Sequence, residues 1–162
     1  MKLKNVTLTA MMTGLCVIGS FIKIPSPLGS TALDSAPAFL AATILPPAYA
    51  GLVGFLGHLA TALSSGMPLG PLHFIVAVEM LLIVSGFAML HRKQRHIAKW
   101  AFLLVMNGII APVPFYFFIS PAFYLGALPS LIVATSINVI VTILVIPFVL
   151  KATTRLGGHS NA

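Results

Sequence analysis

Residues 73–105 read HFIVAVEMLLIVSGFAMLHRKQRHIAKWAFLLV, two apolar runs on either side of the basic stretch HRKQRHIAK. An α-helix needs about 20 predominantly apolar residues to cross a bilayer core of roughly 30 Å. The first run, 73–90, approaches that length, and the second continues beyond the quoted stretch to about residue 118. Lysine and arginine gather in the cytoplasmic connections of membrane proteins. The stretch therefore predicts a pair of transmembrane helices joined by a short cytoplasmic turn.

The composition of the whole chain indicates the same class. Hydrophobic residues make up 59% of the 162 residues and charged residues only 7%, whereas soluble domains are about 45 to 50% apolar and about 25% charged. Strands of an outer-membrane barrel would alternate polar and apolar residues over about ten positions, and the sequence has no such segments. The net charge is +7, and the basic residues that produce it lie in short connections. We therefore take them as an indication of membrane topology and not of nucleic-acid binding.

Proline and glycine mark the ends of the predicted helices. They divide the chain into roughly six membrane helices in a single transmembrane domain, 1–162, with no room for a soluble domain. Pro112 and Pro114 are expected to kink or break the fifth helix near its end. The helices are expected at about residues 5–22, 35–45, 48–64, 71–90, 100–118 and 125–150.

Basic residues are concentrated in connections that six helices would place on one side of the membrane. Because such residues gather on the cytoplasmic side, both termini are expected in the cytoplasm. Of the nine lysines and arginines, Lys23 alone is then outside; Lys2 and Lys4, the stretch 91–99, and Lys151 with Arg155 are inside. The outer connections are rich in proline, glycine and serine and could form a lid. We expect the N-terminal apolar run to remain as the first helix rather than to be cleaved as a signal peptide.

Ionisable side chains within the apolar segments are the candidates for function, because each costs roughly 2.5 to 3.5 kcal/mol at the centre of a membrane helix. Four of them fall in the outer half: Asp34, His58, His73 and Glu79. Glu79 has no charged neighbour at helical spacing, so its partner must come from another helix or from a ligand. The other three also have a structural interpretation. Asp34 or Ser35 could cap a helix, His58 could hydrogen-bond across a packed helix pair, and His73 could be solvated at the interface.

Asn107 and Asn138 are expected near the middle of the membrane, where they could bond each other across helices or contact a substrate. On the first helix, Ala10 and Gly14 form a pair of small residues four apart, which allows another helix to approach closely. That helix could belong to this chain or to a partner subunit.

Catalytic and metal-binding motifs are missing from the sequence. It contains no HExxH, no GxxxxGK[ST] phosphate loop and no GxSxG nucleophile elbow, and its one cysteine, Cys16, lies inside the first apolar run. We therefore expect no enzyme activity, no catalytic residue, no metal site and no cofactor.

The block ALDSAPAFLAATILPPAYAGLVGFLGHLATALSSGMPLGPLHF, residues 32–74, and the chain as a whole resemble the substrate-binding S components of energy-coupling factor (ECF) transporters. The resemblance implies a multi-pass protein of the bacterial cell membrane, with six helices and an outer-half pocket for a vitamin. It also implies partners, namely a transmembrane coupling subunit and two ATPase subunits, with the S component toppling to release its ligand inside. The family's Ala-xxx-Ala docking motif corresponds to Ala10 and Gly14, the second position being glycine here.

Within that family the chain most resembles S components for alpha-ribazole, a dimethylbenzimidazole joined to ribose. Such a ligand needs an aromatic slot and a few hydroxyl partners. The residues expected to bind it are Asp34, Ser35, His58, His73, Glu79 and Asn107, with Phe39, Phe74 and Tyr116 as ring walls. Cobalamin, niacin, pantothenate or a pyrimidine are the alternative ligands. Alternatives outside the family are a small intramembrane enzyme using His58, His73 and Glu79, a structural bundle, and a channel or autonomous carrier.

Overall fold

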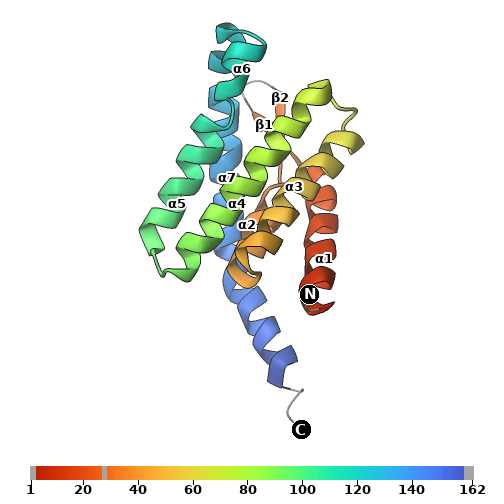
Figure 1. Ribbon diagram of the computed structural model, residues 1–162, viewed down its shortest axis with the longest axis vertical. Coiled ribbons are helices and arrows are strands. Elements are labelled where there is room, and N and C mark those ends of the chain that lie inside the picture. The colour runs from red at the N-terminus through yellow and green to blue at the C-terminus, as the bar shows by residue number, and fades with distance from the viewer. Residues whose placement is uncertain (1–2, 27–28, 159–162) are drawn as a thin grey trace.

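The computed structural model of the protein describes residues 3–26 and 29–158, which form a bundle of helices with one short β-hairpin (Figure 1). The prediction of an all-α membrane bundle is confirmed, and each of the expected helix positions holds a helix. The elements are α1 Leu3–Ser20, β1 Lys23–Ser26, β2 Gly29–Ala32, α2 Ala36–Ile44, α3 Pro47–Ser64, the 3₁₀ turn η1 Gly70–Leu72, α4 His73–Arg92, α5 His96–Val105, the π-helical segment η2 Met106–Ile110, α6 Val113–Phe118 and α7 Pro121–Gly158.

The fifth predicted helix is broken, as its prolines indicate. It consists of α5, the π-helical η2 and, after a turn at residues 111–112, the short helix α6 with Pro112 at its N-cap. Proline has no backbone N–H to donate and clashes with the preceding turn, so it favours a kink or a break in a helix. Helix α7 continues through Pro129 and Pro147, whereas the fifth helix is interrupted next to Pro112. A π-helical segment also widens the backbone locally, and such segments are frequent at functional sites.

Several features differ from the sequence prediction. Helix α5 begins at His96 rather than at about residue 100, and α7 ends at Gly158 rather than at about residue 150. The stretch 119–124, expected as an outer connection, is mostly helical because α7 begins at Pro121, and proline is favoured at the first position of a helix. The first outer loop, predicted only as a connection rich in proline, glycine and serine, folds back on itself as an antiparallel pair in which Lys23 is opposite Ala32. Pairing within the hairpin gives its backbone N–H and C=O groups hydrogen-bond partners, which water would otherwise have to supply.

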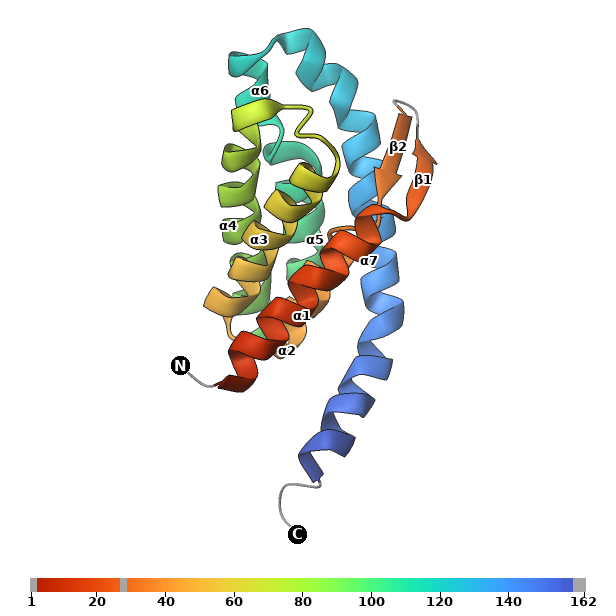
Figure 2. The same ribbon diagram turned by 90° about the vertical axis from the view of Figure 1, so that its right-hand side faces the viewer.

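The charged connections lie at one end of the bundle. The start of α1, the α4–α5 turn and the end of α7 lie at the lower end in Figures 1 and 2, whereas β1, β2 and α6 lie at the upper end. The basic residues from 91 to 99 therefore share an end with Lys4 and Lys151, as the predicted topology requires; Lys2 lies outside the described residues. That this end faces the cytoplasm remains a prediction.

Three helical segments in the described part of the chain are long and apolar enough to cross a membrane. They are Gly70–Arg92, His96–Phe118 and Pro121–Lys151. Helix α2 has only nine residues, about 14 Å at 1.5 Å per residue, so it extends through only part of a bilayer core. Its partial length leaves room above it for the hairpin and for a cavity.

Helix α3 packs against α4 and α1 through glycines. A Cβ atom added at Gly54 would lie 2.8 Å from the carbonyl oxygen of Met80 on α4, and one added at Gly57 would lie 2.8 Å from the Cys16 sulfur on α1. Small residues let helix backbones approach closely where packing, not hydrophobicity, drives association in lipid. The close α3–α4 contact places His58 beside the first turn of α4.

We expect Gly54→Ala to destabilise the protein by about 1 to 3 kcal/mol, because the added methyl group meets backbone that cannot move aside easily. Gly14→Ala is the matched control, since a Cβ atom there meets nothing within 4 Å. Thermal unfolding in detergent, followed by circular dichroism, measures both. Equal unfolding temperatures for the two variants would contradict the close α3–α4 packing.

Candidate binding site

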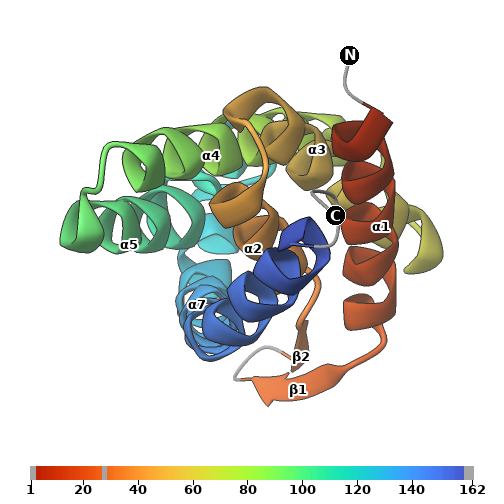
Figure 3. The same ribbon diagram turned by 90° about the horizontal axis from the view of Figure 1, so that it is seen from below.

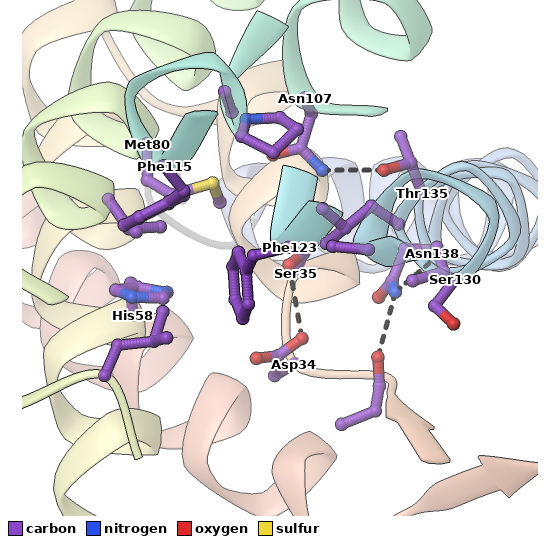
Figure 4. A pocket seen from close by; sticks show the side chains of 18 residues that line it. Asp34, Ser35, His58, Met80, Asn107, Phe115, Phe123, Ser130, Thr135 and Asn138 are labelled. Carbon is purple, nitrogen blue, oxygen red and sulfur yellow. Dashed lines mark hydrogen bonds between the residues drawn. The ribbon is translucent and has the colours of Figure 1, made fainter. Parts of the chain in front are cut away.

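A cavity of about 490 Å³ lies between the segment that leads into α2, helices α3 and α4, the π-helical η2, α6 and α7 (Figure 4). Its wall is mostly apolar, with a small number of polar groups on different elements. The lining residues used below are Asp34, Ser35, His58, Val76, Met80, Asn107, Phe115, Phe123, Leu131 and Thr135. Concave, largely apolar sites with a few polar groups are the usual form of small-molecule pockets.

The start of α2 is capped from a distant helix. The backbone N–H of Ala36 donates to Oδ1 of Asn138 on α7 over 2.7 Å, and the amide nitrogen of Asn138 donates to the carbonyl oxygens of Ala32 and Ala134. Ser35, at the N-cap position, makes no side-chain capping bond. The interpretation of Asp34 or Ser35 as a simple helix cap is therefore wrong, because Asn138 supplies the oxygen that a cap would supply.

Asp34 is consequently left to face the cavity. The Ser35 hydroxyl donates to its Oδ1 over 3.2 Å, and Figure 4 shows the two side chains together at the wall. The second carboxyl oxygen is an acceptor for hydroxyl or N–H groups of a ligand.

Asn107 also lines the cavity, at the π-helical segment. Its Nδ2 donates to Oγ1 of Thr135 on α7 over 2.8 Å, so the expected bond between Asn107 and Asn138 is not formed. Thr135, Asn138 and Thr142 are all buried, and their spacing puts them on one face of α7. That polar stripe in an apolar helix was the signal in the sequence that could have identified Thr135.

His58 lines the cavity, and His73 stands directly behind it. Nε2 of His58 and Nδ1 of His73 are 3.1 Å apart, and the backbone N–H of Leu69 donates to Nε2 of His73 over 3.2 Å. His73 is buried and is not itself part of the cavity wall. The interpretation of His73 as a solvated interfacial residue is therefore wrong.

The aromatic wall differs from the one expected. Phe39 is fully buried in the core, Phe74 is 57% exposed on the outside of α4, and Tyr116 packs against Phe117 and Tyr124; none of the three lines the cavity. Phe115 on α6 and Phe123 on α7 line it instead, with their ring centroids 6.1 Å apart and their planes at 69°. The broken fifth helix turns Phe115 inward and Tyr116 outward, which helical periodicity alone could not indicate.

Glu79 is the other acidic residue of the chain. It precedes the cavity-lining Met80 on α4 but does not line the cavity, and its Oε2 is buried without a hydrogen-bond partner among the described residues. Its expected ligand contact therefore stays a prediction that the cavity does not support. In the described part of the chain, no group of three or more His, Cys, Asp or Glu side chains comes together.

The exposed face of α1 carries the predicted small residues. Helix α1 packs against α2 and α3 at the edge of the bundle (Figure 3), and Ala10 and Gly14 are both exposed. Met11 and Ile18 beside them are 59% and 61% exposed. The interpretation of the pair as internal packing is therefore wrong, because both residues face away from the bundle.

A comparison with protein families gives the class of this bundle. The family model described as "ECF transporter, substrate-specific component" matches residues 4–153. The chain belongs to this family. No curated protein and no solved structure shows a significant match.

Family membership establishes the general role of the protein. As an ECF S component it is a multi-pass protein of the cell membrane and a substrate-binding transport subunit, not an enzyme. It binds a small molecule and associates in the membrane with a coupling subunit and ATPase subunits. The cavity is accordingly the candidate substrate site, and the exposed apolar helices are candidates for the contact with the coupling subunit.

Proposed function

We propose that this S component binds alpha-ribazole in the cavity and delivers it to the cell interior when its partner ATPases hydrolyse ATP. The observation that carries the proposal is a cavity whose one formally charged lining residue among those described is the carboxylate Asp34. The size, the charge and the aromatic lining of the cavity each bear on the choice of ligand.

The volume favours a nucleoside-sized ligand. A space of about 490 Å³ lies within the range of about 300 to 1,000 Å³ that is usual for small-molecule sites. Cobalamin carries a corrin ring as well as a nucleotide and is several times larger than alpha-ribazole. The cavity volume therefore argues against intact cobalamin.

The charge favours a neutral ligand that donates hydrogen bonds. Niacin and pantothenate are carboxylates at neutral pH, and no lysine or arginine is among the described residues that line the cavity. A carboxylate placed beside the Asp34 carboxylate would be repelled by it, and no basic side chain of the cavity wall would offset this repulsion. Ribose hydroxyls, in contrast, donate to a carboxylate, and hydrogen bonds to a charged group contribute about 1.5 to 3 kcal/mol.

The apolar part of the wall suits a flat aromatic ring with methyl groups. Phe115 and Phe123 come from α6 and α7, and Val76, Met80 and Leu131 add aliphatic surface. Aromatic rings prefer offset or edge-to-face arrangements, which the Phe115–Phe123 pair can offer to a benzimidazole. In this pose Ser35, Asn107 and Thr135 lie among the polar groups available to the ribose.

The contact with the coupling subunit is proposed at Ala10 and Gly14. Their exposure and the open space beside Gly14 allow a partner helix to approach the backbone of α1. Both termini and the basic α4–α5 turn would then face the cytoplasm, where the ATPase subunits bind.

Uptake by reconstituted vesicles tests the proposed function. Labelled alpha-ribazole should accumulate in liposomes that contain this protein, its coupling subunit and both ATPases with ATP, and unlabelled niacin or pantothenate should not compete. Accumulation of another vitamin with no uptake of alpha-ribazole would overturn the ligand assignment. Accumulation with this protein alone would contradict its role as a subunit.

A further inference from the structure

We infer that His58 presents an Nδ1–H donor to the cavity, that His73 and the backbone of Leu69 fix it in this state, and that the site therefore selects a ligand with an unprotonated ring nitrogen. This inference rests on the proposed function for the identity of the ligand. The fixed state of His58 itself follows from hydrogen bonds within the protein.

The chain of hydrogen bonds begins at the α3–α4 connection. The backbone N–H of Leu69 can only donate, and it points at Nε2 of His73 over 3.2 Å. Nε2 of His73 must therefore carry a lone pair, which leaves the proton of the neutral ring on Nδ1. A doubly protonated His73 could not accept this bond.

The tautomer of His73 in turn determines the tautomer of His58. Nδ1 of His73, which carries the proton, is 3.1 Å from Nε2 of His58. Nε2 of His58 must then accept, so the proton of the neutral His58 ring resides on Nδ1. The reverse direction, with His58 donating, would place a proton on Nε2 of His73 opposite the Leu69 N–H.

The remaining donor of His58 is free for a ligand. Nδ1 makes no hydrogen bond to any residue that the structure describes, although His58 lines the cavity (Figure 4). An unpaired N–H beside a bound ligand costs about 1 to 3 kcal/mol if the ligand offers it no acceptor. The site therefore discriminates against ligands with a C–H group at this position.

The benzimidazole of alpha-ribazole has the required acceptor. One of its ring nitrogens carries the ribose, and the other is unprotonated and can accept from Nδ1–H. Asp34 would accept hydrogen bonds from the ribose hydroxyls, and His58 would donate one to the ring nitrogen. The two residues therefore recognise donors and an acceptor of the same ligand. His58 is on this account a specificity-determining residue and His73 a positioning residue.

A matched pair of ligands tests the contact by calorimetry. The indole analogue, α-ribofuranosyl-5,6-dimethylindole, replaces the accepting nitrogen by C–H and keeps the shape. The wild-type protein should bind alpha-ribazole about tenfold more tightly than this analogue, and His58→Leu should bind the two equally. His58→Asn, whose amide can place a donor near Nδ1, should restore part of the preference. An unchanged preference in His58→Leu, or no preference in the wild type, would overturn the contact.

Nuclear magnetic resonance of the wild-type protein tests the hydrogen-bond chain without relying on any variant. Long-range ¹⁵N–¹H correlation spectra of ¹⁵N-histidine-labelled protein distinguish the two neutral tautomers, and both His58 and His73 should give the Nδ1–H pattern. His73→Leu should release His58 from this single tautomer and reduce the preference for alpha-ribazole, whereas His73→Asn, with a donor near the same place, should retain more of both. An Nε2–H pattern for His58 in the wild type would overturn the inference.

The two measurements separate this inference from the proposed function. If alpha-ribazole does not bind the wild type, the ligand assignment and the contact to its ring nitrogen both fail. The tautomer pattern then still decides whether His73 and Leu69 fix His58. If alpha-ribazole binds tightly and the indole analogue binds equally well, the proposed function stands and the role of His58 fails.

Discussion

Gly14→Trp is expected to abolish ATP-driven uptake and to leave ligand binding unchanged. Gly14 is exposed on the outer face of α1, and a Cβ atom added there meets nothing within 4 Å, so a tryptophan side chain fits on the isolated subunit. A helix of the coupling subunit packed close to this position would collide with the indole ring, because interfaces between membrane helices depend on small residues. Uptake in reconstituted vesicles and calorimetry on the same purified variant measure the two effects.

The matched control places the same side chain on another helix. Leu82 on α4 is 62% exposed, and Leu82→Trp should leave both uptake and binding close to the wild-type values. Ala10→Trp should behave like Gly14→Trp, since the two residues are one helical turn apart on the same face. Normal uptake by both the Ala10 and Gly14 variants would remove α1 as the docking surface.

Asp34→Asn is expected to weaken alpha-ribazole binding about ten- to a hundredfold. The substitution keeps the shape of the side chain but exchanges a carboxylate for an amide. The loss corresponds to about 1.5 to 3 kcal/mol for hydrogen bonds to a charged group. Because Asn138 and not Asp34 caps α2, the unfolding temperature should change little. Isothermal titration and thermal unfolding of the same variant separate these effects.

Glu79→Gln provides the matched control for this prediction. It makes the same change of carboxylate to amide on α4, but Glu79 does not line the cavity. Affinity should change by less than about twofold, as is usual for substitutions away from a site. Equal losses for the two variants would mean that the ligand reaches Glu79 and that the binding site extends beyond the cavity. Unchanged affinity in Asp34→Asn would remove Asp34 from the site.

The helices could be predicted from the sequence because length and apolar composition determine them directly. Prolines marked the break in the fifth helix, and the basic residues predicted which connections share an end of the bundle. Of the predicted binding residues, Asp34, Ser35, His58 and Asn107 came to line one cavity. The sequence could indicate these lining positions because polar groups are rare in membrane helix bundles and usually face the interior. That they bind a ligand remains a prediction.

The features that sequence analysis missed depend on contacts between distant residues. Asn138 caps α2 across 102 positions, which made the local interpretation of Asp34 as a cap misleading. His73 hydrogen-bonds to His58, which lies 15 positions away in the sequence. No local sequence pattern indicates that these two residues are in contact. Phe115 and Phe123 face the cavity because the chain turns between α6 and α7, and a helical period cannot be carried through that break.

The measurement that tests the account most directly is a calorimetric titration of the purified, ligand-stripped protein against alpha-ribazole, dimethylbenzimidazole, cobalamin, niacin and pantothenate. Alpha-ribazole should bind tightly. Dimethylbenzimidazole should bind much more weakly, because it lacks the ribose that Asp34 would hold. Niacin, pantothenate and cobalamin should not bind. Tight binding of niacin or pantothenate, with none of alpha-ribazole, would contradict the account.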